Sequence, residues 1–282
     1  MTNILLSAFS DEYATSFEEQ LIGMRDFGIR YIELRHADGI NVSCMTSEQV
    51  AQAKTLLDRY GIAVSAIGSP LGKIKLDGDL DAHLETAKTV FEAARTLGAR
   101  YVRVFSFYAP DGKRITDMRD EVFSAMEKLL CLAREYGVTL CHENEALIYG
   151  DVPARCRELL DHFGGELKCV FDMGNFVLEG VTPYPDAYEL LKKDIAYFHI
   201  KDALAAGAIV PPGAGEASIK EILSAHVQDT DADFFVSLEP HLQLFDGKNA
   251  LVGRAFDNPY QYADAKEAFA DAVNKFLELT AK

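Results

Sequence analysis

The sequence predicts an α/β fold, a single (β/α)8 TIM barrel that spans residues 1–282. Short apolar segments alternate with amphipathic helical segments, eight such pairs fit the chain, and no linker rich in proline, glycine or serine divides it. This alternation is typical of a parallel sheet covered by helices, and eight units can close into a barrel. An open doubly wound sheet, the alternative, normally has a glycine-rich turn after its first strand. The corresponding stretch, 7–13, contains no glycine.

Each element follows from local patterns. In the first helix, Phe17, Leu21, Met24 and Phe27 recur at helical spacing and Gly28 marks its end. A capping box begins the second predicted helix at position 46. Apolar runs predict strands over 3–9, 31–34, 63–67, 101–105, 138–143, 167–172, 195–199 and 234–239. Helices are predicted over 16–27, 46–60, 81–97, 119–136, 152–162, 185–191, 218–225 and 260–279.

The composition indicates a folded protein, with 49% hydrophobic and 26% charged residues. The N-terminal apolar run is too short for a signal-peptide core, and no later stretch is long enough to span a bilayer. Five scattered cysteines without a C-x-x-C pair argue against a disulfide framework and a structural zinc site. We therefore expect a cytoplasmic protein with reduced thiols. Its net charge of -16 opposes binding to a nucleic-acid backbone.

Four predicted strand ends carry the residues that indicate function: Glu143, Asp172, His199 and Glu239. Side chains alternate faces along a strand, so one face of each strand can direct its terminal polar residue to a common centre. In a barrel, the C-terminal ends of the strands meet at the rim where active sites lie. Neighbouring strands are about 4.8 Å apart, so these four side chains could surround one ion. The sequence therefore predicts a metal site at this rim.

The ligand types narrow the choice of metal. Three carboxylates and one imidazole form an oxygen-rich set that suits Mn2+ or Mg2+, with Co2+ or Zn2+ as alternatives, and we expect Mn2+. Each residue alone has an ordinary explanation, because an acidic residue after a strand often caps the next helix and a lone histidine often packs in the core. The combination favours a metal site. His142 alternates to the opposite face and is expected to pack toward the helices.

The strand-end residues, the HIKD run at 199–202 and the LEPH run at 238–241 give the chain a family resemblance. It resembles the xylose isomerase-like barrel superfamily, and within it the sugar phosphate isomerase/epimerase branch (AP endonuclease family 2). This branch includes ketose 3-epimerases, inosose dehydratase and endonuclease IV. The resemblance covers nearly the whole chain. It implies that the four strand-end residues are metal ligands, and that Glu143 and Glu239 also act as acid and base on opposite faces of a substrate.

The implied chemistry is proton transfer beside a carbonyl. A divalent ion on a sugar carbonyl and an adjacent hydroxyl acidifies the neighbouring C–H bond. Return of the proton from the opposite face gives epimerisation, return at the adjacent carbon gives isomerisation, and loss of a β-substituent gives a lyase. We expect a sugar isomerase or epimerase that acts on a keto-sugar or polyol derivative. The alternative is a lyase, either inosose dehydratase-like or cleaving keto-glycosides.

Departures from the family pattern bear on this choice. The ketose epimerases that the chain resembles carry a histidine where it has Asn175 and an arginine where it has Ala205. Lys201 and Asp202 look more like the dehydratase side of the family. The further histidines of endonuclease IV are missing from 209–213, which opposes a DNA-repair function. A catalytically inactive sugar-binding barrel is disfavoured because the ligand set and both glutamates are present.

Further residues are expected around the substrate. The resemblance places Asn175, Lys201 and Asp202 there, and strand alternation adds His241, which shares a face with Glu239. Glu33 and Arg35 share a face at the end of the second strand and could contact substrate hydroxyls, with a salt bridge at the rim as the alternative. The segment 242–259 is long enough to form a lid. Neither a phosphorylated substrate nor a homo-oligomer is decided by the sequence, and no membrane partner is expected.

Overall fold

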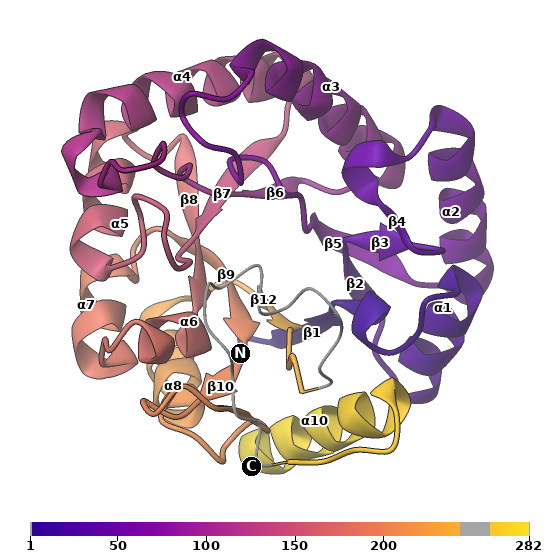
Figure 1. The fold of residues 1–282 in the computed structure, drawn as a ribbon. Coiled ribbons are helices and arrows are strands. Elements are labelled where there is room, and N and C mark those ends of the chain that lie inside the picture. The colour runs from indigo at the N-terminus through magenta and orange to yellow at the C-terminus, as the bar shows by residue number, and fades with distance from the viewer. Residues whose placement is uncertain (1, 243–259, 282) are drawn as a thin grey trace.

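Eight parallel strands form the centre of the protein, and helices surround them (Figure 1). The structure is a computed structural model that describes residues 2–242 and 260–281. The strands are β1 (Ile4–Ala8), β2 (Tyr31–Leu34), β5 (Ala63–Ile67), β6 (Tyr101–Val104), β7 (Thr139–Glu143), β8 (Leu167–Asp172), β9 (Ile195–Ile200) and β12 (Phe234–Leu238). Their order in the sheet is β1-β12-β9-β8-β7-β6-β5-β2. Because β2 also lies beside β1, the sheet is a nearly closed barrel, and the predicted fold is confirmed.

The outer layer consists mainly of helices that connect successive strands. They are α1 (Phe17–Asp26), α2 (Ser47–Tyr60), α3 (Leu80–Leu97), α4 (Arg119–Tyr136), α5 (Pro153–His162), α6 (Met173–Leu178), α7 (Tyr188–Leu191), α8 (Ile219–Asp229) and α10 (Ala265–Thr280). The capping box of α2 is present, because Thr46 and Gln49 each bond the other's backbone N–H through their side chains. Helices α2, α3 and α4 each end just before a glycine in the left-handed conformation, namely Gly61, Gly98 and Gly137.

Several short elements at the C-terminal rim differ from the sequence prediction. Helix α6 begins directly after β8, because the Asp172 carboxylate accepts a hydrogen bond from the Asn175 backbone N–H at 2.8 Å. Two hairpins also lie outside the predicted pattern: β3 (His36–Ala37) with β4 (Ile40–Asn41), and β10 (Asp202–Ala203) with β11 (Ile209–Val210). Within the predicted helix over 185–191, only α7 is a regular α-helix, and an irregular turn over Pro183–Ala187 precedes it. These elements shape the rim around the strand ends.

Apolar side chains fill both the space between strands and helices and the lower part of the barrel. The larger core packs the outward faces of the strands against the helices. Inside the barrel, a smaller cluster contains Ala66, Cys141, Val170 and Tyr197. The polar strand ends lie above this cluster, so the barrel is closed below the site. All five cysteines are free thiols, as expected. Within the described ranges, no helix has the length and apolarity needed to cross a membrane.

Candidate metal centre

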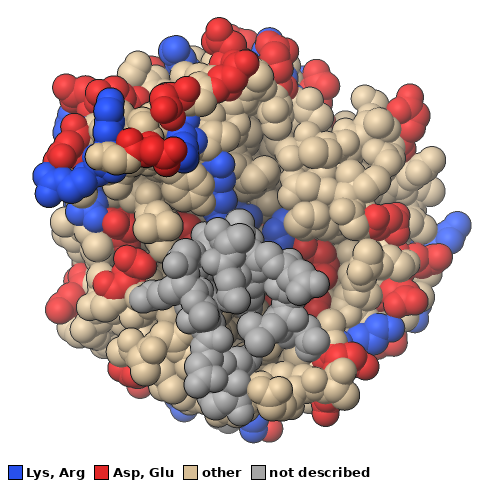
Figure 2. Space-filling model, in the orientation of Figure 1, with Lys and Arg blue, Asp and Glu red and all other residues tan. Residues whose placement is uncertain are grey.

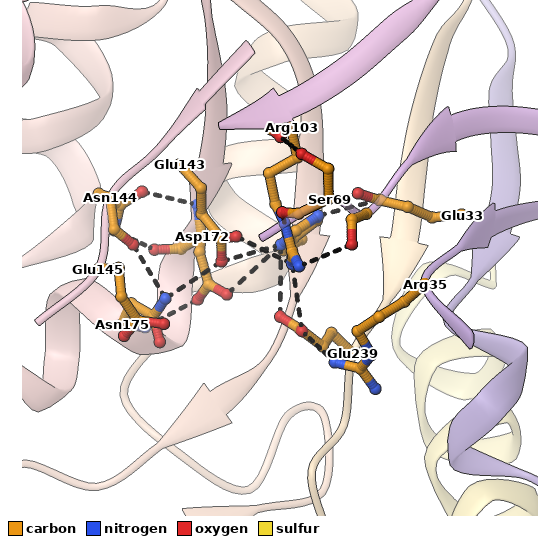
Figure 3. Close-up of polar contacts among 12 residues, drawn as sticks. Glu33, Arg35, Ser69, Arg103, Glu143, Asn144, Glu145, Asp172, Asn175 and Glu239 are labelled. Carbon is orange, nitrogen blue, oxygen red and sulfur yellow. Dashed lines mark hydrogen bonds and ion pairs between the residues drawn. The ribbon is translucent and has the colours of Figure 1, made fainter. Parts of the chain in front are cut away.

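The structure brings the four strand-end residues together. Glu143 and Asp172 end β7 and β8, His199 is the penultimate residue of β9, and Glu239 directly follows β12. Asp172 and His199 are direct partners in the ladder between β8 and β9. Each of the four residues offers a donor atom within 4.8 Å of the donor atoms of the others, and all four residues are buried. Figure 3 shows Glu143, Asp172 and Glu239 converging from their separate strands.

The spacing of the donor atoms fits a single ion. His199 Nδ1 lies 3.1 Å from Glu143 Oε1, 3.4 Å from Glu239 Oε2 and 3.7 Å from Asp172 Oδ2. Donors that bind one ion at about 2.0–2.2 Å are about 3 Å apart when they are neighbours in its shell. The second oxygen of Glu143, Oε2, is buried and forms an ion pair with Arg103 Nη1 at 3.1 Å. Three carboxylates and an imidazole nitrogen in this arrangement can hold a divalent cation.

The two glutamates are held as carboxylates. Burial alone would raise the pKa of Glu143, but His199 and Arg103 lower it to about 2. Burial opposes the ionisation of Glu239 in the same way, and Lys201 and His241 hold its pKa well below its ordinary value. Both side chains are therefore negatively charged near neutral pH. This is the state in which a carboxylate can ligate a cation or accept a proton.

Lys201 lies against the ligand cluster and lines the cavity above it. Its ammonium donates hydrogen bonds to Asp172 Oδ2 at 2.9 Å, Glu239 Oε2 at 3.0 Å and Asn175 Oδ1 at 3.1 Å. Burial opposes its charge, but Asp172 and Glu239 outweigh this and raise the pKa of Lys201 well above its ordinary value. Asn175 in turn donates to Glu143 Oε1 at 3.2 Å. The structure thus places Lys201 and Asn175 in contact with the four-residue cluster and the cavity.

Arg103, on β6, is the site residue that the sequence analysis missed. Its Nη1 atom lies 3.1 Å from Glu143 Oε2 and 3.5 Å from Glu239 Oε1, between the two glutamates (Figure 3). The other nitrogens donate to the carbonyls of Gly68 at 3.2 Å and Ser69 at 3.4 Å, which fix the guanidinium in place. The available signal was an arginine in the middle of the apolar run YVRVF. Strand alternation alone does not show that such a residue reaches both Glu143 on the neighbouring strand and Glu239, which follows a strand four positions away in the sheet.

The side of the site formed by β1 and β2 contains a second set of charges. Arg35 donates to Glu239 Oε1 at 3.0 Å, to Asp11 Oδ2 at 2.8 Å and to Glu12 Oε1 at 3.3 Å. His241 Nε2 lies 3.4 Å from Glu12 Oε1 and 3.8 Å from Glu239 Oε1. Its backbone is left-handed, with φ of 49°, an uncommon conformation for a residue other than glycine. Arg35 and His241 both line the cavity.

Two of the predicted substrate residues have other contacts, and these predictions are corrected here. Glu33 is fully buried, and its carboxylate contacts His199 Nε2 and the Tyr197 hydroxyl, each at 3.0 Å, beneath the cavity. Asp202 is buried as well. Its carboxylate accepts the backbone N–H groups of Ala203, Gly213, Gly215 and Ala217. Alternation indicated the face of each side chain but not its depth. Glu33 contacts His199, and Asp202 binds the loop that contains β11.

The cavity above the centre has a volume of about 300 Å³. Arg35, Lys73, Arg103 and Lys201 are among its lining residues, so cations surround a carboxylate-rich floor. Lys73 pairs with Glu145 across the rim at 3.1 Å. Figure 2 shows Lys and Arg side chains in the central hollow of a surface that carries many acidic groups. The predicted lid, 242–259, lies outside the described residues except for Leu242.

Replacing Lys201 by methionine is expected to destabilise the metal-free protein by roughly 3–5 kcal/mol, because buried Asp172 and Glu239 lose a shared positive partner. Saturating Mn2+ should recover more stability in this variant than in the wild type, since the ion restores the missing charge. Urea unfolding with and without Mn2+ measures both effects. Lys220→Met, on the exposed face of α8, is the control. Equal stabilisation of the Lys201 variant and the wild type by Mn2+ would contradict this account.

Comparison with known proteins identifies the family. The family model described as xylose isomerase-like TIM barrel matches residues 24–270. No curated protein sequence matches the chain. Among solved structures, the probable 3-DHS dehydratase AsbF from Bacillus anthracis has a TM-score of 0.73 at 19% identity, with full coverage of both chains.

Two further structures have the same fold. A D-allulose 3-epimerase from Methylomonas sp. has a TM-score of 0.72 at 14% identity, with 99% of each chain covered. A xylose isomerase-like TIM barrel protein from Mycobacterium smegmatis, solved in complex with magnesium, has a TM-score of 0.71 at 15% identity, with 99% of this chain and 96% of that chain covered. From the family match, this chain belongs to the xylose isomerase-like TIM barrel family.

Proposed function

We propose that the protein is a divalent-metal-dependent isomerase or epimerase that acts on a keto-sugar or polyol derivative. The observation that carries this proposal is the position of the two glutamates. Glu143 and Glu239 both belong to the ligand cluster, yet β8 and β9 separate their strands in the sheet. They therefore approach the centre from two sides. Two carboxylates in this relation can remove a proton from one face of a substrate and return it to another.

The residues that would hold the ion are Glu143, Asp172, His199 and Glu239. A bound divalent ion would polarise a substrate carbonyl and make the adjacent C–H bond more acidic. We propose Mn2+, with Mg2+, Co2+ and Zn2+ as alternatives, because the donor set is dominated by oxygen. The magnesium-bound relative supports a divalent ion in this fold.

The protein's own side chains would do the remaining work. Arg103 lies beside both glutamates and can donate to a substrate oxygen placed between them, which would stabilise negative charge that develops there. Lys201 and Asn175 line the same cavity, and their hydrogen bonds to Asp172, Glu239 and Glu143 would hold these carboxylates in place. Arg35 and His241 close the side next to β1 and β2. A small sugar or polyol therefore meets hydrogen-bonding groups on several sides.

The second candidate is a lyase or dehydratase that uses the same proton abstraction. Lys201 favours it, because its ammonium lines the cavity and could exchange one of its three hydrogen bonds to protein groups for one to a departing oxygen. The similarity in fold to a probable dehydratase also supports it. The two candidates share the first step, removal of a proton beside the carbonyl. An isomerase or epimerase then returns a proton to the substrate, whereas a lyase expels a β-substituent.

Product analysis separates these candidates. Mn2+-loaded protein is incubated in D2O with ketoses, oxidised glycosides and inososes, and the mixtures are followed by NMR. An epimerase or isomerase should place solvent deuterium beside the carbonyl and yield a stereoisomer or a shifted carbonyl. A lyase should release water or an aglycone and yield an unsaturated product. If protein that binds the ion produces neither exchange nor turnover with any member of this panel, the proposed substrate class is wrong.

A further inference from the structure

The environment of His199 shows which of its nitrogens can bind an ion. Nδ1 faces the three carboxylates of the cluster, with the closest oxygen at 3.1 Å. Nε2 points the other way and lies 3.0 Å from Glu33 Oε2. The imidazole is fully buried, and so is the Glu33 carboxylate. The two nitrogens of His199 therefore face different partners: Nδ1 faces the cluster and Nε2 faces Glu33.

Glu33 reaches His199 across the inside of the barrel. It lies on β2, and in the closed ring β1 and β12 separate β2 from β9. No ladder hydrogen bond connects the two residues, so the side chains alone make this contact. The other oxygen of Glu33 accepts a hydrogen bond from the Tyr197 hydroxyl at 3.0 Å. A carboxylate oxygen only accepts, so the Tyr197 hydroxyl donates this hydrogen bond.

The neighbours of His199 decide which nitrogen keeps its hydrogen when an ion binds. A carboxylate only accepts hydrogen bonds, so without an ion both nitrogens carry a hydrogen, Nε2 toward Glu33 and Nδ1 toward Glu143. An ion in the cluster would replace the hydrogen on Nδ1, whereas the hydrogen on Nε2 would stay directed at Glu33, which leaves a neutral imidazole with its lone pair on Nδ1. This lone pair then points at the space between the three carboxylates. A carboxylate behind a ligating histidine also increases the basicity of the imidazole toward a metal.

We infer that Glu33 is a positioning residue that holds His199 as an Nδ1 ligand and strengthens its bond to the ion. Tyr197 supports it by binding the second carboxylate oxygen. This inference rests on the proposed metal centre. It adds Glu33 to the residues that tight metal binding requires. Glu33 touches neither the cavity nor the cluster of ligand oxygens, so its effect passes through His199.

The test compares metal affinity in wild-type protein, Glu33→Gln and Tyr197→Phe. Glu33→Gln keeps the size of the side chain but removes its charge, and Mn2+ affinity measured by titration calorimetry should fall about 10- to 100-fold. Tyr197→Phe removes the hydroxyl that binds the second oxygen of Glu33 but leaves the carboxylate against His199, so its affinity should fall less than that of Glu33→Gln. Thermal unfolding of the metal-free proteins shows whether each variant is folded.

A second measurement uses the unmodified chain. In 15N-histidine-labelled protein loaded with diamagnetic Zn2+, the NMR signals of His199 should show a hydrogen on Nε2 and coordination through Nδ1. Coordination through Nε2 would overturn the inference, even if Glu33→Gln does not fold. Unchanged Mn2+ affinity in folded Glu33→Gln would overturn it as well.

The outcomes also separate this inference from the proposed function. If the wild type binds no divalent ion, the metal centre fails and the inference fails with it. If wild type binds the ion and the Glu33 variant loses affinity, the inference holds whether or not any sugar is turned over. A purely structural role for Glu33 would lower thermal stability and leave the metal affinity and the tautomer unchanged.

Discussion

Glu143→Gln and Glu239→Gln are each expected to reduce turnover by roughly 10²- to 10⁴-fold, because each removes a carboxylate that can transfer a proton. Glutamine is nearly isosteric with glutamate, so the buried fold should persist. The affinity for the ion should weaken too, since both residues belong to the donor cluster. Steady-state kinetics with a substrate found by the NMR panel, together with metal titration of each variant, measures both effects.

The control for these variants is Glu166→Gln. Glu166 lies on the surface just before β8 and pairs with Arg134. Glu166→Gln therefore makes the same chemical change at a place away from the cavity. Its turnover should match that of the wild type. One of the two site variants could still exchange substrate hydrogen with D2O if the other glutamate removes the proton. Full turnover in both variants with the ion bound would refute the use of two proton-transfer groups.

Removal of the metal is expected to abolish turnover, because the carbonyl then lacks the charge that makes its neighbouring C–H acidic. Chelator-treated protein should regain activity on addition of Mn2+, and elemental analysis should show about one ion per chain, as expected if the four-residue cluster holds it. The metal-free protein should stay folded, since Lys201, Arg103 and Arg35 already provide counter-charges to the carboxylates.

Metal binding should also increase the stability of the folded protein. An ion at 100 times its dissociation constant stabilises the folded state by about 2.7 kcal/mol if it does not bind the unfolded chain. The unfolding temperature should therefore rise with the concentration of Mn2+. Undiminished turnover after complete removal of divalent ions, verified by elemental analysis, would contradict the metal-dependent mechanism.

The metal cluster was accessible to sequence reasoning for a physical reason. Parallel strands of a barrel all end at the same rim, and a period of two places alternate side chains on one face. Glu143, Asp172, His199 and Glu239 each follow an apolar run at its end, so their convergence required only the fold class and the strand boundaries. The structure then placed all four within reach of one ion.

The residues around the cluster were harder to predict. Arg103 lies inside a strand, and its role depends on the length of its side chain and on two backbone carbonyls from the loop after β5. Glu33 and Arg35 share a face of β2 but differ in depth, so one supports a ligand and the other lines the cavity. Asp202 binds backbone groups of a loop whose path no local pattern specifies.

The sequence by itself determined the repeated strand and helix units, the closure of eight such units into a barrel, and the four residues that meet at its rim. These features depend on periodicity and on local end signals, which are properties of short segments. Only the tertiary structure decided which charges pair with the ligands, which nitrogen of His199 faces the cluster, and which predicted substrate residues are buried. Those contacts join residues as far apart as Glu33 and His199, and their distances depend on the tilt, register and depth of strands on opposite sides of the barrel.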